Sequence, residues 1–380
     1  MKMIRILFLI FVYFECSTAY AQILRSEYYA ALPFWESPLT PFRGACPVSQ
    51  EQAKKLIHLQ LNYDSLNRVI SAEVRLGDRL KAFEGFSGNL YINAPLTRVQ
   101  YAGDLEIHTF YDRFGQPVEV MDQVFQKVYE KDRYGRNIKL FFLDKEGKYT
   151  QDQFGFVRYE WEYENNGSVI EQRFNEEGVP GPLRGQFQFI RTRMTYGPEG
   201  YPVVLENIDE QGNLLNSASG AAVYRYFYNS FGRFDRWEVY DRDGNPAKGP
   251  SGTGGEQNYF HGCYLREIDF FSPEGGPVTH WSGAEKWRMR YDRYGNTTML
   301  QYQDEHRRPK NANNGFAEVR YDWSDDGHYL LSRSYYDKQG EPTNHQKDGI
   351  FKTLYIRDDV GNISEVINYK VDINGDILEN

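Results

Sequence analysis

The sequence predicts an all-β fold: a tandem array of about ten antiparallel hairpin repeats, each of about 32 residues, forming an elongated twisted sheet or solenoid. Three observations predict this class. Glycines recur at a nearly constant spacing, the segments between them alternate aromatic with charged residues, and aromatic residues make up 16% of the chain. A closed β-shell or propeller is the alternative, although a propeller blade normally needs four strands and about 40 residues.

The chain opens with the pattern of a cleavable signal peptide over residues 1–21. Lys2 and Arg5 precede an apolar run over residues 6–14, and "AYA" at residues 19–21 fits the small-x-small rule for signal peptidase. The run is too short to cross a bilayer comfortably, and no second run of about 18 apolar residues follows. We therefore expect an exported protein without a membrane span, located in the periplasm, elsewhere in the cell envelope, on the cell surface or outside the cell.

Residues 22–56 carry no repeat, and we expect them to form an N-terminal cap on a repeat domain of residues 57–380. In the cap, "SQEQAKKLI" is compatible with a short helix. One repeat orders about 32 residues at roughly 1–2 kcal/mol of backbone entropy each. A buried aromatic side chain returns about 1.5–3 kcal/mol. A single repeat therefore cannot stand alone, and neighbouring repeats must cover one another's aromatic faces.

A first turn marks each repeat: Tyr or Phe, usually Asp or Asn, two residues and Gly, as in "YNSFGR" and "YDRYGN". Its last position recurs in steps of 36, 32, 32, 33, 32, 30, 33, 32 and 34 residues. The positions are Asn67, Gly103, Gly135, Gly167, Gly200, Gly232, Gly262, Gly295, Gly327 and Gly361. Glycine supplies the positive φ that tight hairpin turns require, so consecutive segments are expected to pair antiparallel.

Two further turns punctuate each repeat. A "D-x-x-G-x-P" turn or a relative of it follows the first turn, at Gly115, Gly147, Gly178, Gly212, Gly244, Gly275, Gly340 and Gly375, with Arg307 instead of glycine once. A third glycine precedes the first turn in most repeats, at Gly155, Gly220, Gly283, Gly315 and Gly349. Three turns per repeat predict two medium strands and one shorter linking piece, and prolines such as Pro342 fix the exit from the second turn.

The strands themselves are predicted by a period of two. After Gly155, one set of alternate positions holds Val157, Tyr159, Trp161 and Tyr163, and the other holds Arg158, Glu160 and Glu162. The segments after Gly220, Gly283 and Gly315 alternate in a similar way. This is the pattern of a strand covered on one side, so the aromatic face is expected to line a shared core and the charged face to meet water.

The turns "YDRYGN", "YNSFGR" and "YDSLNR" resemble the YD repeats of Rhs-type bacterial surface and toxin proteins, whose core is Tyr-Asp-x-x-Gly-Arg/Asn. The resemblance extends over residues 57–380, and "GFAEV" and "GAAVY" give a fainter likeness to WG-type repeats. The chain departs from the Rhs type in its 32-residue double-hairpin unit and in its "D-x-x-G-x-P" turn, and it shows no toxin or self-cleavage module. The resemblance implies an exported or surface β-repeat scaffold and no particular activity.

Net charge and cysteine content exclude further classes of protein. A formal net charge of −9 gives no electrostatic footprint for nucleic acid or an anionic bilayer. After the signal peptide the cysteines are Cys46 and Cys263, too few for a disulfide framework. Export permits one disulfide between them, and two separate thiols are the alternative.

No catalytic or metal-binding motif stands out. The chain has no Gly-x-Ser-x-Gly elbow, phosphate loop or "HExxH", and "HGC" at residues 261–263 is better explained as a loop than as a metal site. "DRDGN" (residues 241–245) and "DINGD" (residues 372–376) are similar to calcium loops, but their Gly is fourth where an EF-hand needs it sixth. Asp-Gly turns explain both, so we predict no metal, no cofactor, no catalytic residue and no enzyme activity.

The largest departure from periodicity is "AKGPSGTGGEQNYFHGC", residues 247–263. Because loops on rigid scaffolds are favoured recognition sites, Tyr259, His261 and nearby Trp281 are the candidate ligand-binding residues, and a degenerate repeat is the alternative. The function we favour is a non-catalytic exported scaffold or binding protein with a protein or glycan partner. The alternatives are a carbohydrate-binding module with aromatic platforms, and an enzyme or toxin-associated component.

Overall fold

The computed structural model describes residues 22–34, 36–40, 42–81, 94–357 and 366–378, and these residues form strands and turns almost throughout. The predicted all-β class is confirmed. The predicted signal peptide (residues 1–21) and Gly361 lie outside the described residues. In the part of the chain that is described, no helix has the length and apolar character needed to cross a bilayer.

The described strands carry the following bounds. They are β1 (Arg25–Ala31), β2 (Ala45–Pro47), β3 (Ile57–Tyr63), β4 (Val69–Leu76), β5 (Arg79–Leu80), β6 (Leu96–Ala102), β7 (Leu105–Tyr111), β8 (Gln126–Lys131), β9 (Asn137–Leu143), β10 (Tyr149–Thr150), β11 (Arg158–Tyr163), β12 (Val169–Phe174), β13 (Arg191–Tyr196), β14 (Pro202–Asn207), β15 (Val223–Tyr228), β16 (Phe234–Tyr240), β17 (Gly255–His261), β18 (Tyr264–Phe271), β19 (Lys286–Tyr291), β20 (Thr297–Gln303), β21 (Glu318–Trp323), β22 (Leu330–Tyr336), β23 (Lys352–Arg357), β24 (Val366–Val371) and β25 (Ile377–Leu378).

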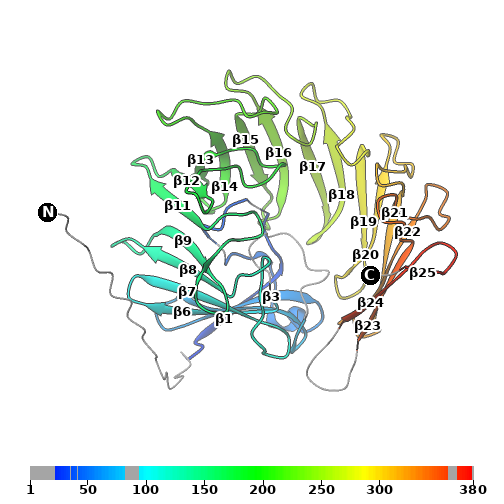
Figure 1. The fold of residues 1–380 in the computed structure, drawn as a ribbon, viewed down its shortest axis with the longest axis horizontal. Coiled ribbons are helices and arrows are strands. Elements are labelled where there is room, and N and C mark those ends of the chain that lie inside the picture. Colours follow the sequence, from blue (N-terminus) through cyan, green and yellow to red (C-terminus); the bar gives the residue numbers. More distant parts are fainter. Residues whose placement is uncertain (1–21, 35, 41, 82–93, 358–365, 379–380) are drawn as a thin grey trace.

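These strands form one antiparallel meander. Each strand from β6 onward pairs with the next along the chain, apart from the short β10, which lies beside β9. The beginning of the sheet has the order β2–β1–β3–β4–β6, with β5 beside β4. No pairing between described strands joins the last strands to the first, so the sheet is open, as predicted. It curves strongly, and Figure 1 shows its strands following an arc from β1 to β24.

The first turn of each repeat has the predicted chemistry. In the turn at residues 132–136, the Gly135 N–H donates to the Asp132 carbonyl at 2.9 Å, and the Asp132 N–H donates to the Arg136 carbonyl at 2.9 Å. The Asp132 carboxylate accepts from the backbone N–H groups of Tyr134 and Arg136 at 2.8 and 3.0 Å. Gly135 has φ 78°, which an L-residue adopts with strain. The acidic residue therefore closes the turn.

The second and third turns produce the short linking piece. After β22, the chain turns at residues 337–341 and folds back for a few residues, with an isolated bridge between Tyr336 and Pro342. A turn ending at Gly349 then reverses it, and β23 takes its place beside β22. Each repeat thus contributes one hairpin and one short looped segment, which connects the second strand of that hairpin to the next hairpin.

The aromatic residue of the first turn joins neighbouring hairpins. β9 and β11 pair only from Lys139 to Phe141, and they separate toward the first turn. There the Tyr163 hydroxyl donates to the Asn137 carbonyl at 2.9 Å, and the Arg136 guanidinium lies 4.1 Å from the Tyr163 ring centroid. Equivalent bonds at the same kind of gap run from Tyr101 to Val69, Tyr291 to Leu265 and Trp323 to Thr297. The Tyr and Arg of the turn motif thus hold successive repeats together.

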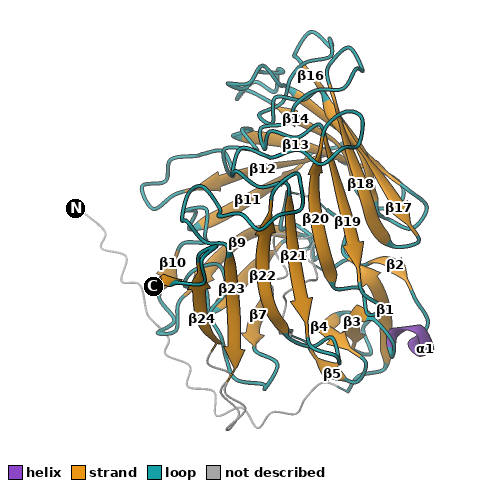
Figure 2. Cartoon of the chain, turned by 90° about the vertical axis from the view of Figure 1, so that its right-hand side faces the viewer, coloured by secondary structure: helices purple, strands orange, loops and turns teal. Residues whose placement is uncertain are grey.

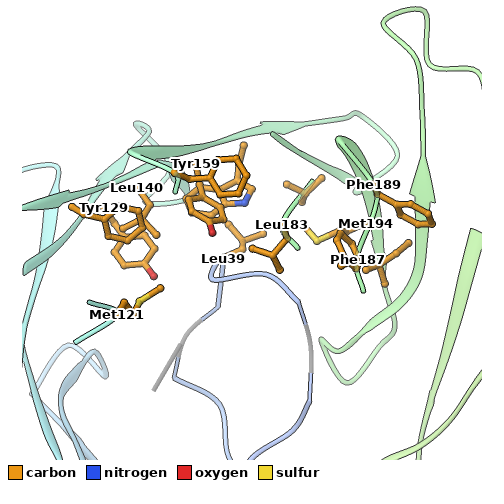
Figure 3. Packing of buried hydrophobic residues seen from close by; sticks show 14 of the residues in the cluster. Leu39, Met121, Tyr129, Leu140, Tyr159, Leu183, Phe187, Phe189 and Met194 are labelled. Carbon is orange, nitrogen blue, oxygen red and sulfur yellow. The ribbon is translucent and has the colours of Figure 1, made fainter. Parts of the chain in front are cut away.

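The aromatic face of the sheet forms its core, as predicted. Tyr159, Trp161, Tyr224 and Tyr226 are buried, whereas Glu162 on the other face is exposed. The main cluster extends from β7 to β16, and Figure 3 shows part of it, with Tyr129 of β8, Tyr159 of β11 and Phe189 of the segment before β13. One member of the cluster, Leu39, comes from the N-terminal segment, which passes beneath the sheet in the same view.

The N-terminal segment therefore lies inside the curve of the sheet. The Tyr129 hydroxyl donates to the Pro38 carbonyl at 3.0 Å, and the Asn137 amide donates to the Leu39 carbonyl at 3.0 Å. Strands β1 and β2 extend the sheet, and the helix α1 (Gln50–Ala53) stands beside them at that edge (Figure 2). This helix lies where "SQEQAKKLI" predicted one, and Ser49 caps its N-terminus. Residues 22–56 thus combine two strands, an interior segment and one helical turn.

Curvature also brings first turns of later repeats onto the N-terminal segment and the start of β3. The Cys46 N–H donates to the Phe231 carbonyl at 2.7 Å, and the Ile57 N–H donates to the Tyr294 carbonyl at 2.9 Å. A disulfide joins Cys46 to Cys263, whose Cα atoms are 5.9 Å apart although 217 residues separate them in the chain. The sheet is therefore open, and turns of later repeats contact its first strands.

Candidate functional site

The structure does not bring the three predicted ligand-binding residues together. Tyr259 and His261 are exposed near the turn at Gly262, at one end of the β17–β18 hairpin. Trp281 follows the opposite end of β18, where its N–H donates to the Ser251 carbonyl at 3.0 Å. Tyr259 faces Glu267 on the neighbouring strand. The three side chains therefore do not form a common surface.

A pocket of about 740 Å³ lies where the N-terminal segment meets the first turns of two later repeats. We call it the aromatic pocket. Its cap wall comes from β1, β3 and residues 42–47, and its turn wall from residues 199–201 and 228–232. Six aromatic side chains line it: Tyr29, Phe42, Tyr63, Tyr201, Tyr228 and Phe231. Its volume lies in the range of about 300–1,000 Å³ that is usual for small-molecule sites.

The cap wall is held by a charged hydrogen-bond cluster. The hydroxyls of Tyr29 and Tyr63 both donate to the Glu27 carboxylate, at 2.7 and 2.8 Å, and the Arg25 guanidinium lies 4.0 Å from the Tyr63 ring centroid. Burial acts to raise the pKa of Glu27, but these hydroxyls and Arg25 outweigh it, and the pKa is lowered. Burial and Glu27 raise the pKa of both tyrosines. The two rings are therefore oriented by an ionised carboxylate.

The turn wall is built from stacked rings. Tyr201 and Tyr228 stack with their centroids 4.6 Å apart at 18°, and the Tyr228 hydroxyl donates to the Phe34 carbonyl at 3.1 Å. From the cap wall, the Arg43 guanidinium lies 4.4 Å from the Tyr201 ring centroid. Such a cation–π contact contributes about 0.5–2 kcal/mol. Arg43 thus connects the two walls across the pocket.

Close approach requires glycine in the turn wall. Gly200 has φ 73°, and a Cβ there would lie 2.5 Å from the Arg43 Nη1 atom. Gly232 has φ 74°, and a Cβ there would collide with the Tyr201 hydroxyl. The glycines of these turns therefore do more than set the turn geometry, because they also admit the side chains that shape the pocket.

Polar groups with unused hydrogen-bonding capacity line the turn wall. The Asn229 Oδ1 atom accepts from the N–H groups of Phe231 and Arg233 at 3.0 and 3.1 Å, while its Nδ2 atom donates to no described residue. The Ser230 hydroxyl and the Glu199 carboxylate likewise make no hydrogen bond or ion pair with the described part of the chain. Phe231 is 54% exposed. The wall therefore offers both an aromatic surface and polar groups to a ligand.

A second group of titratable residues lies in the core, away from this pocket. Lys127 on β8 is buried opposite His108 on β7, and burial lowers its pKa to about 7. The Asp152 carboxylate accepts from the Tyr159 hydroxyl at 2.7 Å, and burial raises its pKa. These side chains are packed among core rings and do not line the aromatic pocket. We interpret them as part of the packed interior.

No set of three or more His, Cys, Asp or Glu side chains within the described ranges could hold a metal ion. The carboxylates of the two calcium-like stretches serve turns: Asp241 accepts from the N–H groups of Asp243 and Asn245 at 2.9 and 2.8 Å. Asp372 accepts in the same way from residues 374 and 376. Turn chemistry therefore accounts for these carboxylates.

Sequence reasoning missed the aromatic pocket because its walls are more than 130 residues apart in the chain. A signal was available at Phe231, an apolar residue next to the glycine of a turn that was expected to face water. Leu66, Tyr134 and Tyr294 occupy the same turn position. Leu66 and Tyr134 are exposed, but the Tyr294 ring packs against the apolar cluster of β3 and β4. An apolar residue at this position therefore does not identify the pocket by itself.

Comparisons with known proteins place the chain in no family. No family model matches it, and no curated protein matches it. Among solved structures, the crystal structure of TcdB2-TccC3-TEV is similar over 85% of this chain and 19% of that chain, at 13% identity and a TM-score of 0.27. A Tc holotoxin pore of Photorhabdus luminescens is similar over 83% of this chain and 19% of that chain, at 14% identity and a TM-score of 0.25. The chain thus spans about a fifth of the length of these toxin components.

Proposed function

We propose that the protein is an exported, non-catalytic binding protein that takes its ligand in the aromatic pocket. The observation that supports this most is the pocket of about 740 Å³, in which six aromatic side chains lie beside polar groups that no described residue uses. Sites for small ligands are commonly concave, mostly apolar and equipped with a few polar groups that fix orientation. Export is inferred from the signal pattern, and the Cys46–Cys263 disulfide is in keeping with an oxidising compartment.

The pocket lining favours a neutral, hydroxylated ring such as a saccharide. Ring faces such as that of Phe231 can cover the apolar side of a sugar, while Asn229 and Ser230 can exchange hydrogen bonds with its hydroxyls. Arg43 and Glu199 contribute one positive and one negative charge to the lining, so neither an anion nor a cation is favoured as a whole. A carbohydrate-binding module needs accessible aromatic platforms, and the pocket offers aromatic rings on a concave surface.

The lining supports binding more than catalysis. Ser230 carries the serine hydroxyl of the pocket lining, which is the type of group that acts as a nucleophile in many enzymes. No described histidine or carboxylate accepts a hydrogen bond from it. Nucleophilic catalysis requires such a base within hydrogen-bond distance. Positioned hydrogen bonds and stacking require no base. We therefore assign the pocket to recognition.

The test is a binding screen with two matched variants. The purified chain is titrated with neutral cello-, malto- and chito-oligosaccharides, with muropeptides and with a peptide library, and affinity is read by calorimetry. Phe231→Ala removes the exposed ring from the pocket, whereas Tyr134→Ala removes the ring at the same turn position of another repeat, outside the pocket.

We expect a member of the screen to bind, Phe231→Ala to weaken that binding at least roughly tenfold, which corresponds to about 1.4 kcal/mol, and Tyr134→Ala to leave it unchanged. Absence of binding throughout the screen, or equal losses in both variants, would refute the assignment. A peptide that binds through Phe231 would keep the pocket as the site and exclude the saccharide.

A further inference from the structure

The Cys46–Cys263 disulfide adjoins the aromatic pocket. Cys46 lies on β2 between Ala45 and Pro47, and Pro47 belongs to the cap wall. Cys263 follows Gly262 in the first turn of the next repeat after the one that supplies Phe231. Among the described residues this bond is the covalent crosslink between the N-terminal segment and the later repeats.

We propose that this disulfide is a redox latch for the aromatic pocket. In the oxidised protein it holds residues 42–47 against the turns and keeps the pocket assembled, and its reduction releases this segment while the repeat sheet stays folded. The consequence for ligand affinity rests on the proposed function, whereas the release of the segment does not.

Residues 42–47 have little backbone pairing, and side-chain packing supplies the rest of their noncovalent contacts. Phe42 packs against the apolar cluster of β3 and β4, and Ala45 and Cys46 are buried in a small apolar cluster with β1. Strand β2 pairs with β1 at two positions, Tyr29 with Pro47 and Ala31 with Ala45. Toward the turns, the Cys46 N–H donates to the Phe231 carbonyl at 2.7 Å, and Arg43 stacks on a tyrosine ring. The hydrogen bond from Cys46 fixes the backbone of the residue that supplies the exposed ring of the turn wall. Loss of the disulfide should therefore loosen the cap wall and the Phe231 backbone together.

The segment just before residues 42–47 is anchored independently of the disulfide. The Tyr228 hydroxyl donates to the Phe34 carbonyl at 3.1 Å, and Arg184 pairs with Glu36 at 2.6 Å. Leu39 belongs to the main core cluster. On the other side, β3 pairs with β4 along its whole length. We therefore expect only residues 42–47 to be released on reduction, while the segments on either side and the repeat sheet keep their structure.

The two sulfur atoms differ in exposure. Cys46 is fully buried, whereas Cys263 is partly exposed. The thiolate of a dithiol reductant is expected to attack the Cys263 sulfur, so that the S–S bond breaks and Cys46 leaves and takes up a proton. The second thiol of the reductant then releases Cys263 as a thiol, and the reductant becomes a disulfide. Two electrons and two protons pass from the dithiol to the protein.

The test compares hydrogen exchange in the oxidised full chain, the same chain treated with dithiothreitol, and the double variant Cys46→Ser/Cys263→Ser. Alkylation of the thiols confirms reduction. We expect the amide of residue 46 to exchange at least roughly tenfold faster in both disulfide-free samples, while core amides such as Tyr159 and Tyr224 keep their protection. Unchanged exchange at residue 46 would overturn the latch, and so would a loss of protection throughout the core.

A second measurement separates the latch from the proposed function. The three samples are titrated with the oligosaccharide set of the binding screen. A roughly tenfold loss of affinity in both disulfide-free samples supports control of the pocket by the latch. Equal affinity in all samples refutes this control and leaves the pocket as a binding site. Faster exchange at residue 46, combined with no binding in any sample, supports the release of the segment and refutes the proposed function.

Discussion

Replacing Lys127 with methionine is expected to raise the free energy of unfolding at neutral pH. Lys127 is fully buried on the inner face of β8, with its Nζ atom 5.4 Å from the Phe110 ring centroid. Burial lowers its pKa from 10.5 to about 7, although the nearby Asp152 carboxylate acts to raise it. Methionine has a similar length and no charge, so the substitution removes the cost of burying the ammonium group.

The sign and size of the effect follow from proton linkage. Between pH 7 and pH 10.5 the unfolded chain binds the proton of Lys127 more tightly than the folded chain does, so stability rises with pH across this window. One pKa unit corresponds to about 1.36 kcal/mol, so at pH 7 the buried lysine costs roughly 4 kcal/mol relative to its neutral form. We expect Lys127→Met to stabilise the protein by roughly 2–4 kcal/mol at pH 7, with the gain falling toward zero as the pH approaches 10.5.

Urea unfolding of both proteins at several pH values in this window measures the difference directly, because titrating groups that do not interact with Lys127 contribute equally to both. The control is Lys139→Met on β9, where the side chain is 35% exposed and lies 3.7 Å from Glu130. This change should alter stability by less than about 0.5 kcal/mol. A Lys127→Met protein that is less stable at pH 7, or a gain that does not shrink as the pH rises, would refute the reasoning.

Three further predictions concern the repeat itself and are measured by the free energy of unfolding in urea. Tyr163→Phe removes the 2.9 Å hydrogen bond to the neighbouring hairpin and should cost about 1 kcal/mol. The control Tyr134→Phe, at an exposed residue, should cost almost nothing. Equal costs in the two variants would count against the role of that hydrogen bond. Gly135→Ala should cost about 1–2 kcal/mol, because alanine is strained at the φ of 78° found there. Gly295→Ala should cost more, because its Cβ would also lie 2.7 Å from a tyrosine hydroxyl. A larger loss for Gly135→Ala than for Gly295→Ala would contradict this packing. Glu171→Ala should cost about 3–5 kcal/mol, because it leaves a buried arginine without the partner it has at 2.5 Å, and a loss below 1 kcal/mol would contradict this.

Local features of the repeat were predictable because they depend on neighbouring residues in the chain. Asp132 and Gly135 form the expected hairpin turn, because a short acidic side chain caps the backbone and glycine accepts positive φ. Tyr159 faces the core and Glu162 faces water, because strand residues alternate with a period of two. Both rules act over a few residues, and ten copies repeat them.

The curvature of the sheet was not predictable in the same way. The curvature accumulates from small rotations between neighbouring strands, and the sequence of a single repeat does not specify the total rotation. The contact of Cys46 with Cys263 and the pocket between Arg43 and Tyr201 both depend on it. The pairing of the cysteines was therefore left open by the sequence, and the pocket was not foreseen.

Curvature and strand order also decide where the candidate residues around the irregular loop lie. Tyr259 and Trp281 are 22 positions apart in the chain, and both were chosen because they lie in or near the irregular loop. The β17–β18 hairpin lies between them and places them at its opposite ends. Their individual roles in binding stay predictions, with Tyr259 and Trp281 exposed and unconnected.

The most direct measurement of the central claim is an experimental structure of the protein bound to the saccharide or peptide that the binding screen retains. The account predicts ligand density between the cap wall and the turn wall, in contact with the Phe231 ring and within hydrogen-bond distance of Asn229 or Ser230. Ligand density at the outer face, at Tyr259 or at Trp281, with the aromatic pocket empty, would contradict it.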